Sequence, residues 1–401
     1  MFGAVEAFFG ILLTILFCIS GIGLLSILGK NNFTKVDLMI SLGCGISIPM
    51  VTSWISWFFE SEITDSASLT LASLFFFGGV WSIFSRKATI EMGPVRGEVF
   101  SLIALLAIVG SRLSFHPHSS QGLFLGNDLE DHFAVANDWF NGYFTYIPEV
   151  YPRGFHSLLL FVNSGEEVNV WQINALIIPI LVLGWGSIIL IVRRFCSDPA
   201  TAVLLVIVSG ILVPNPDEAS GLILSESHRW MMRNAILLPE TLAWSFCSLI
   251  LLVGSEVKPL DGVSEKSKII VIGLICFSYS ITNPYWIMLN TASGFFLILA
   301  LRTPNPRKIN KSDLYWSTLP ILAVSMTFFT MKIMRFLYDG SEVVILFSDE
   351  TTRPNLVLEE GVGGIIELIR PKILEITENV IYSLIYMYSN YLASLCHYFI
   401  N

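Results

Sequence analysis

Charged residues are scarce in this chain of 401 residues, because Asp, Glu, Lys and Arg together make up only 14% of it. Soluble domains average about 25% charged residues, so this composition argues against a soluble enzyme or binding module. The formal net charge is −9, and the chain lacks a basic tract with interleaved aromatic residues. A nucleic-acid partner is therefore not expected.

Several sequence motifs are also missing. The six cysteines form no C-x-x-C pair, so they are interpreted as small core residues and not as metal ligands. The Gly-rich phosphate-binding motifs are absent, which argues against a nucleotide site. The absence of H-E-x-x-H and G-x-S-x-G gives no support to metalloproteases or lipases of these types.

Hydrophobic residues make up 54% of the chain, and apolar runs of roughly 18–25 residues recur along its whole length. This pattern predicts an all-α, polytopic helical membrane protein with about eleven spans. It also predicts a single transmembrane domain over residues 1–401. The expected spans are 3–29, 38–59, 67–85, 97–115, 170–192, 199–214, 236–255, 268–282, 285–301, 315–337 and 379–399. The pair at 268–282 and 285–301 reads either as a tight hairpin or as one broken helix.

The distribution of cations predicts the orientation of these spans. Of the 23 Lys and Arg residues, 14 fall in one set of connecting loops, which the positive-inside rule places in the cytoplasm. The N-terminus is then outside, and the loops at 116–169, 215–235 and 338–378 all face out. We therefore expect an integral protein of the plasma (inner) membrane whose active site lies on the external, periplasmic face.

The first large outer loop, residues 116–169, holds most of the candidate catalytic groups. Asp128 and His132 are four residues apart, which places them on one face of a helix, and Asp131 lies between them. One interpretation is a general base or metal ligand at Asp128 or Asp131, with His132 orienting it or binding phosphate. The alternative is a capped interfacial helix with solvated acids.

A second motif in this loop reads YPRGFH, from Tyr151 to His156. Pro152 and Gly154 favour a turn that presents Arg153 and His156 just before a short apolar segment at 155–162. As a helix that segment extends only about 12 Å, too short to cross a bilayer, so it is expected to dip into the membrane edge. The alternative for Tyr151 and His156 is an interfacial belt with a histidine whose hydrogen bonds are satisfied.

Further cations lie near the predicted outer face. The arginine fork matches phosphate oxygens, so these residues are candidates to bind an anionic headgroup, with interfacial snorkelling as the alternative. The predicted substrate-binding residues are Tyr151, Arg153, His156, His228, Arg229, Arg233, Lys332 and Arg335. The outer loop at 338–378 is either a lid over the substrate or a plain connector.

The Asp128-Leu-Glu-Asp-His132 and Tyr151-Pro-Arg-Gly-Phe-His156 pair resembles the D-x-x-x-H and Y-P-x-G-x-H pairing of polytopic membrane glycosyltransferases of the GT-C superfamily. The resemblance covers this loop specifically and the remainder as general architecture. It implies an inverting glycosyltransferase that takes a sugar from a polyprenyl-phosphate-linked donor. The acceptor would be a glycan, a lipid or a protein, and an acid of the first long outer loop would be catalytic.

Two features of the sequence leave alternatives open. The D-x-D motif of metal-dependent oligosaccharyltransferases is absent, so the metal site is unknown and a divalent cation such as Mg²⁺ or Mn²⁺ is a candidate cofactor. A polysaccharide polymerase or ligase would share the same donor class and face. A transporter (flippase) for a lipid-linked glycan would instead place paired charges near the bilayer midplane and use alternating access.

Overall fold

The structure is a computed structural model that describes residues 4–58, 64–85, 87–91, 95–115, 154–163, 170–196, 198, 200–201, 239–282, 288–303 and 309–338. Of these residues, 85% are helical, which confirms a mostly helical protein. All of the described elements belong to one compact unit, Met1–Tyr338. A second unit, Asp339–Asn401, lies outside the described residues, and with it the expected span at 379–399 and the candidate lid.

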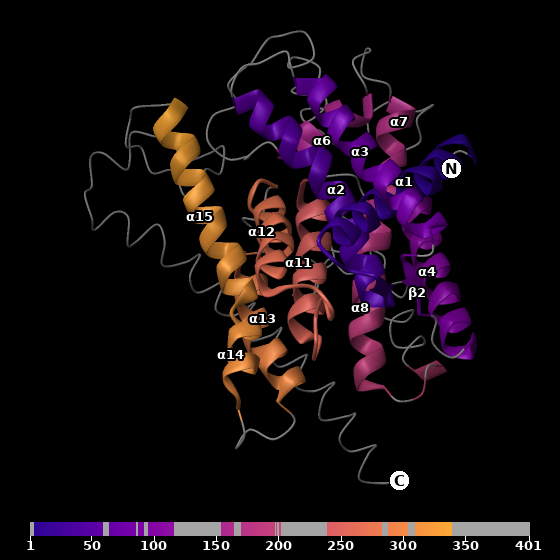
Figure 1. The fold of residues 1–401 in the computed structure, drawn as a ribbon, viewed down its shortest axis with the longest axis vertical. Coiled ribbons are helices and arrows are strands. Elements are labelled where there is room, and N and C mark those ends of the chain that lie inside the picture. Colours follow the sequence, from indigo (N-terminus) through magenta and orange to yellow (C-terminus); the bar gives the residue numbers. More distant parts are fainter. Residues whose placement is uncertain are drawn as a thin grey trace, which may run out of the picture. The chain divides into compact units, whose positions relative to one another are not determined.

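Each predicted span within the described residues coincides with one helix or with two consecutive helices (Figure 1). The helices are α1 (Ala4–Ile27), α2 (Lys35–Phe58), α3 (Thr64–Phe84), α4 (Val95–Phe115), α6 (Gly154–Asn163), α7 (Val170–Ala175), α8 (Ile177–Phe195), α11 (Pro239–Ser255), α12 (Glu265–Ser280), α13 (Met288–Arg302), α14 (Lys311–Ser317) and α15 (Leu319–Tyr338). Nearly all of the predicted span at 199–214 lies outside the described residues, so the total of eleven spans stays a prediction.

Two of the expected spans are interrupted, and proline explains both breaks. The span at 170–192 breaks at Leu176, three residues before Pro179, and the span at 315–337 breaks at Thr318, two residues before Pro320. A proline ring clashes with the carbonyl four residues earlier and removes one backbone donor, so the helix is disturbed in the preceding turn. The Thr318 hydroxyl donates to the Tyr315 carbonyl at 2.6 Å and so caps the first of these half-helices, α14.

Four described helical segments are long and apolar enough to cross a membrane: Ala4–Ile27, Lys35–Ile55, Ile177–Arg194 and Lys311–Met331. Helix α3 adds a stripe of exposed apolar side chains at helical spacing, formed by Leu74, Phe77, Trp81 and Phe84. Phe84 is 82% exposed. A continuous apolar stripe of this kind suits contact with lipid acyl chains, so the bilayer is the natural surrounding of this unit.

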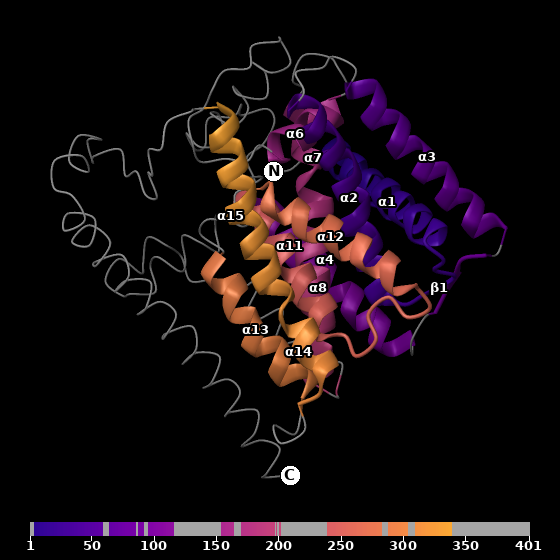
Figure 2. The same cartoon turned by 60° about the vertical axis from the view of Figure 1, so that its left-hand side comes forward.

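Helices α1, α2 and α3 pack closely because glycines face the backbone of their neighbours. Figure 2 shows α3 lying along the outer side of α1. A Cβ atom added at Gly79 of α3 would overlap the Ile19 carbonyl oxygen of α1, and one at Gly21 of α1 would overlap the Ser41 carbonyl of α2. Small residues let helices approach closely in membranes, where dispersion contacts replace the hydrophobic drive.

We expect Gly79→Ala to lower the free energy of unfolding of the purified protein by about 1–3 kcal/mol, because the added methyl group forces α1 and α3 apart. Gly78→Ala is the matched control on the same helix, since its Cβ would meet nothing nearer than the Gly23 Cα at 4.0 Å. The control is expected to be neutral or slightly stabilising, because alanine favours a helix over glycine. Unfolding in detergent micelles measures both variants, and equal effects would contradict this packing.

Helices α12 and α13 run in opposite directions, which argues against a single broken helix. They hardly contact each other and pack instead against α11 and α15, so a tight hairpin is not confirmed, and the connection at 283–287 lies outside the described residues. The last residue of α13, Arg302, donates to the Gly254 carbonyl at the end of α11, and the 256–264 loop leads from there into the start of α12. The other end of α12 lies against the start of α6, through the Ile281 carbonyl. The bundle therefore has two ends, one reached by α6 and one by Arg302.

Candidate functional site

The YPRGFH motif ends in a helix that is fixed to the end of α12. The expected short segment at 155–162 forms helix α6, which has 10 residues and packs against α2, α3 and α7 (Figure 1). The Gly154 amide donates a hydrogen bond of 2.6 Å to the Ile281 carbonyl. The first amides of a helix and the last carbonyls of another lack partners within their own helices, so this contact satisfies one group of each.

Gly154 is required at this contact for a steric reason. A Cβ atom at this position would lie 2.6 Å from the Ile281 carbonyl oxygen and 2.6 Å from the Ile281 Cγ1. Neither a backbone oxygen nor a buried branched side chain can move away easily, so only glycine permits the hydrogen bond. The glycine of the motif thus serves the close approach of two helices, and the expected turn before it, at 151–153, lies outside the described residues.

His156 lies inside the protein and not at its surface. Its side chain is 1% exposed, and its ring contacts the edge of Phe155 with 5.7 Å between ring centroids. Phe155, Ser157 and Leu158 are buried to the same degree. This burial places the His156 ring among other side chains, which agrees with a satisfied histidine, and Tyr151 lies outside the described residues.

Three further buried polar residues near this end were not recognised from the sequence. They are Glu6 in the first turn of α1, Asn174 in α7 and Glu240 in the first turn of α11, with exposed fractions of 3%, 1% and 6%. Carboxyl groups buried in a membrane bundle are costly and usually functional. Glu6 and Glu240 both lie within runs of apolar residues that the sequence assigned as membrane spans. The only sign of a buried carboxyl group was a single acid close to the predicted start of each span.

The elements that carry these residues are in contact. Gly10, one turn after Glu6, faces α7, where an added Cβ would lie 2.7 Å from the Ala175 carbonyl oxygen. On α11, one turn after Thr241, the Ser245 hydroxyl donates to the Ile180 carbonyl of α8 at 2.8 Å. Helix α7 packs in turn against α1, α6 and α8. Helices α1 and α6 therefore both contact the short helix α7, whereas α11 contacts the following helix, α8.

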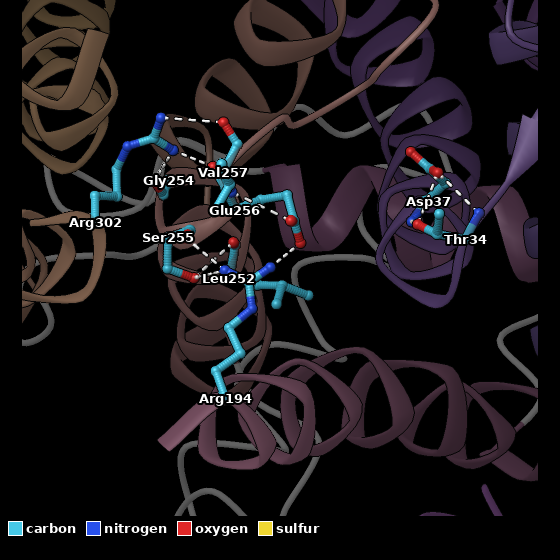
Figure 3. A network of polar contacts seen from close by, with 9 residues as sticks. All are labelled: Thr34, Asp37, Arg194, Leu252, Gly254, Ser255, Glu256, Val257 and Arg302. Carbon is cyan, nitrogen blue, oxygen red and sulfur yellow. Dashed lines mark hydrogen bonds and ion pairs between the residues drawn. The ribbon is translucent and has the colours of Figure 1, made fainter. Parts of the chain in front are cut away.

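The opposite end of the bundle is held by ion pairs, which we call the ionic end: Lys30, Lys35, Asp37, Glu98, Arg193, Arg194, Glu256, Arg302 and Asp313. In Figure 3, Arg194 of α8 and Arg302 of α13 approach the C-terminal end of α11 from two sides. Arg194 donates to the Ser255 carbonyl and pairs with Glu256, while Arg302 donates to the carbonyls of Gly254, Glu256 and Val257. The last carbonyls of a helix attract cations, so two neighbouring helices cap α11.

Lys30 and Asp37 form the most deeply buried ion pair in the described part of the chain. Their atoms Nζ and Oδ2 are 3.0 Å apart, and the side chains are 3% and 4% exposed. Lys30 also donates to the Asp261 carbonyl at 2.7 Å, and Asp37 accepts hydrogen bonds from the Thr34 amide and hydroxyl (Figure 3). The pair therefore fastens the 256–264 loop to the turn between α1 and α2.

Glu98 completes the ionic end by joining α2, α4 and α8. It pairs with Lys35 and lies 3.5 Å from an Arg193 guanidinium nitrogen, which also donates to the Ser101 hydroxyl. Beside it, strand β1 (Asn32–Phe33) pairs in parallel with strand β2 (Thr89–Ile90). Five of the cations that predicted the orientation are thus also structural, because acids of other elements pair with them: Lys30, Lys35, Arg193, Arg194 and Arg302.

Most of the predicted site residues fall outside the described residues, so the structure does not place them. They are Asp128, Asp131, His132, Tyr151, Arg153, His228, Arg229 and Arg233. Lys332 and Arg335 lie on the last turns of α15, where only the backbone is described. Within the described ranges, no group of three or more His, Cys, Asp or Glu side chains is arranged to hold a metal ion.

Comparisons with known proteins add no relative from which a role could be transferred. No protein-family model matches the chain, and no curated protein or solved structure matches it significantly. The functional argument therefore rests on the two motifs between Asp128 and His156 and on the geometry around α6.

Proposed function

We propose that the chain is a membrane glycosyltransferase that resembles the GT-C type and transfers a sugar from a polyprenyl-phosphate-linked donor. The observation that supports it most is the hydrogen bond of 2.6 Å between the Gly154 amide and the Ile281 carbonyl. It fixes the end of the YPRGFH motif, with buried His156, onto the bundle. A transferase needs such a support because a small misplacement of reacting groups costs a large factor in rate.

The proposed reaction inverts the anomeric centre. Asp128, with Asp131 as the alternative, removes the proton of the acceptor hydroxyl, whose oxygen attacks the anomeric carbon opposite the phosphate. The bond between that carbon and the phosphate oxygen breaks, and the polyprenyl phosphate leaves. Arg and Lys side chains, here proposed as Arg153, Arg229 and Arg233 with Lys332 and Arg335, stabilise the charge that develops on it. His132 and His156 orient the substrate.

The proposed site lies on the external face of the plasma (inner) membrane, with the N-terminus outside and the ionic end in the cytoplasm. The excess of cations in the loops of the ionic end supports this orientation. A divalent cation such as Mg²⁺ or Mn²⁺ would add charge stabilisation at the phosphate if the carboxylates of the first outer loop bind one. The acceptor is a glycan, a lipid or a protein.

The contacts at the ionic end argue against the transporter alternative. Alternating access requires the helix ends to separate on each side of the membrane in turn. At the ionic end, Arg302 of α13 links α11 and α14, through the Gly254 carbonyl and through Asp313 at 3.3 Å. Opening this end would strand partly buried charges, which is costly. A protein that works from one side has no need to open it.

Transfer of a radiolabelled sugar tests the proposal. The purified protein is reconstituted into vesicles with a panel of polyprenyl-phosphate-linked sugars and candidate acceptors, and two quantities are measured: labelled product and movement of the donor across the bilayer. The proposal predicts labelled product with one donor class and no movement beyond that of protein-free vesicles. Movement of intact donor without a new glycosidic bond would instead establish a transporter.

A further inference from the structure

The last turn of α12 is a junction of four helices, and we call the residues Tyr279, Ser280 and Ile281 the α12 junction. Ile281 accepts the hydrogen bond from Gly154 of α6. The Tyr279 hydroxyl lies 2.8 Å from the Thr291 hydroxyl of α13, which donates to the Cys247 sulfur of α11 at 3.2 Å. Ser280 reaches α15, because its hydroxyl oxygen lies 3.1 Å from the Thr330 hydroxyl oxygen.

The direction of the hydrogen bond between Ser280 and Thr330 follows because a serine hydroxyl has a single hydrogen to donate. The Ser280 hydroxyl donates its single hydrogen to the Phe277 carbonyl at 2.7 Å. It therefore has only lone pairs left for Thr330, so Thr330 is the donor and Ser280 the acceptor. Both side chains are buried, at 4% exposed for Thr330 and 0% for Ser280. Loss of the Thr330 hydroxyl would leave no other described donor for this lone pair.

We infer that Ser280 and Thr330 are positioning residues, which transmit the position of α15 through the α12 junction to the start of α6. Two adjacent residues of α12 carry the link, since Ser280 accepts from α15 and Ile281 accepts from α6. Thr330 lies two residues before Lys332 and five before Arg335. The same link therefore keeps the proposed phosphate-binding cations of α15 in register with His156. The consequence for catalysis rests on the proposed function, whereas the mechanical link does not.

The test compares two buried threonines of α15 by hydrogen exchange. Thr330→Val removes the hydroxyl that reaches Ser280 and keeps the branched shape. Thr327→Val is the matched control, because Thr327 is equally buried and its hydroxyl bonds only to the Ala323 carbonyl of its own helix at 3.0 Å. We expect amide exchange over residues 154–157 to rise about fivefold in Thr330→Val, as the loss of one buried hydrogen bond implies. Thr327→Val leaves it unchanged.

Two further variants make the test specific. Thr330→Ser keeps the hydroxyl and is expected to restore slow exchange in α6, and Ser280→Ala is expected to act like Thr330→Val. Equal exchange in Thr330→Val and Thr327→Val would overturn the inference, as would failure of Thr330→Ser to restore it. A general loosening of α1 and α2 in Thr330→Val would also overturn it, because a specific link affects α6 and α12 alone.

The exchange measurement uses no sugar donor, so it is independent of the proposed function. Where the wild type transfers sugar, kcat should fall about fivefold in Thr330→Val with KM for the donor unchanged, and recover in Thr330→Ser. Normal kcat together with raised exchange would overturn the role of these residues in positioning the site. Absence of transfer by the wild type, with the exchange pattern as expected, would overturn the transferase and support the link.

Discussion

Replacement of Gly154 by alanine should reduce sugar transfer about 100-fold while the protein remains folded. The added Cβ would lie 2.6 Å from the Ile281 carbonyl oxygen, so the start of α6 must move away from α12. The hydrogen bond between the Gly154 amide and the Ile281 carbonyl is then lost, and His156 moves with its helix. The loss should appear in kcat, because orientation at the reacting centre is what the substitution disturbs.

Gly273→Ala is the control for this prediction. Gly273 lies on α12 itself, and an added Cβ there meets no atom within 4 Å. Its activity should equal that of the wild type, with unchanged or slightly raised stability. Gel filtration and thermal unfolding in detergent establish that both variants are folded. Full activity of Gly154→Ala would show that the α6 contact has no part in the reaction.

The second large effect is expected at the opposite end, where Lys30→Met should lower the free energy of unfolding by about 3–5 kcal/mol. Lys30 and Asp37 are 3% and 4% exposed, and their charged atoms lie 3.0 Å apart. Removing the ammonium group leaves a buried carboxylate whose remaining partners, among the described residues, are the Thr34 amide and hydroxyl. It also frees the 256–264 loop, which Lys30 holds through the Asp261 carbonyl.

Two comparisons isolate the cause of this loss. Lys268→Met removes another ion pair at the same end, with Glu265, whose side chain is 80% exposed. A pair of this kind contributes about 0.3–0.5 kcal/mol, so the control should change little. Lys30→Met combined with Asp37→Asn should recover most of the lost stability, because no charge is then stranded. A double variant as unstable as Lys30→Met alone would show that packing, not charge, carries the effect.

Hydropathy predicted the helices well because each bilayer-spanning helix must be apolar over its whole length, whatever its neighbours. The boundaries of α1 and α4 differ from the expected spans by at most two residues. The breaks at Leu176 and Thr318 were missed, although Pro179 and Pro320 were visible in the sequence, because an apolar run shows no interruption at a proline.

The polar contacts could not be predicted in the same way, because they join residues of different elements, whose packing hydropathy does not show. Lys30 and Arg302 were interpreted only as topology signals, and their partners Asp37 and Asp313 belong to other elements. The reason for Gly154 likewise depends on Ile281, which lies 127 residues later. Of the candidate site, the sequence indicated the short helix α6 correctly, and the structure added the hydrogen bond that joins its start to the end of α12.

The central claim is that an acid of the first outer loop acts as the base in sugar transfer. The most direct test measures transfer of radiolabelled sugar by Asp128→Asn and Asp131→Asn, with Glu130→Gln as the control from the same segment. The account predicts that one aspartate variant loses at least about 100-fold in kcat, as removal of a general base implies, while Glu130→Gln keeps its activity. Equal transfer by all three variants and the wild type would contradict it.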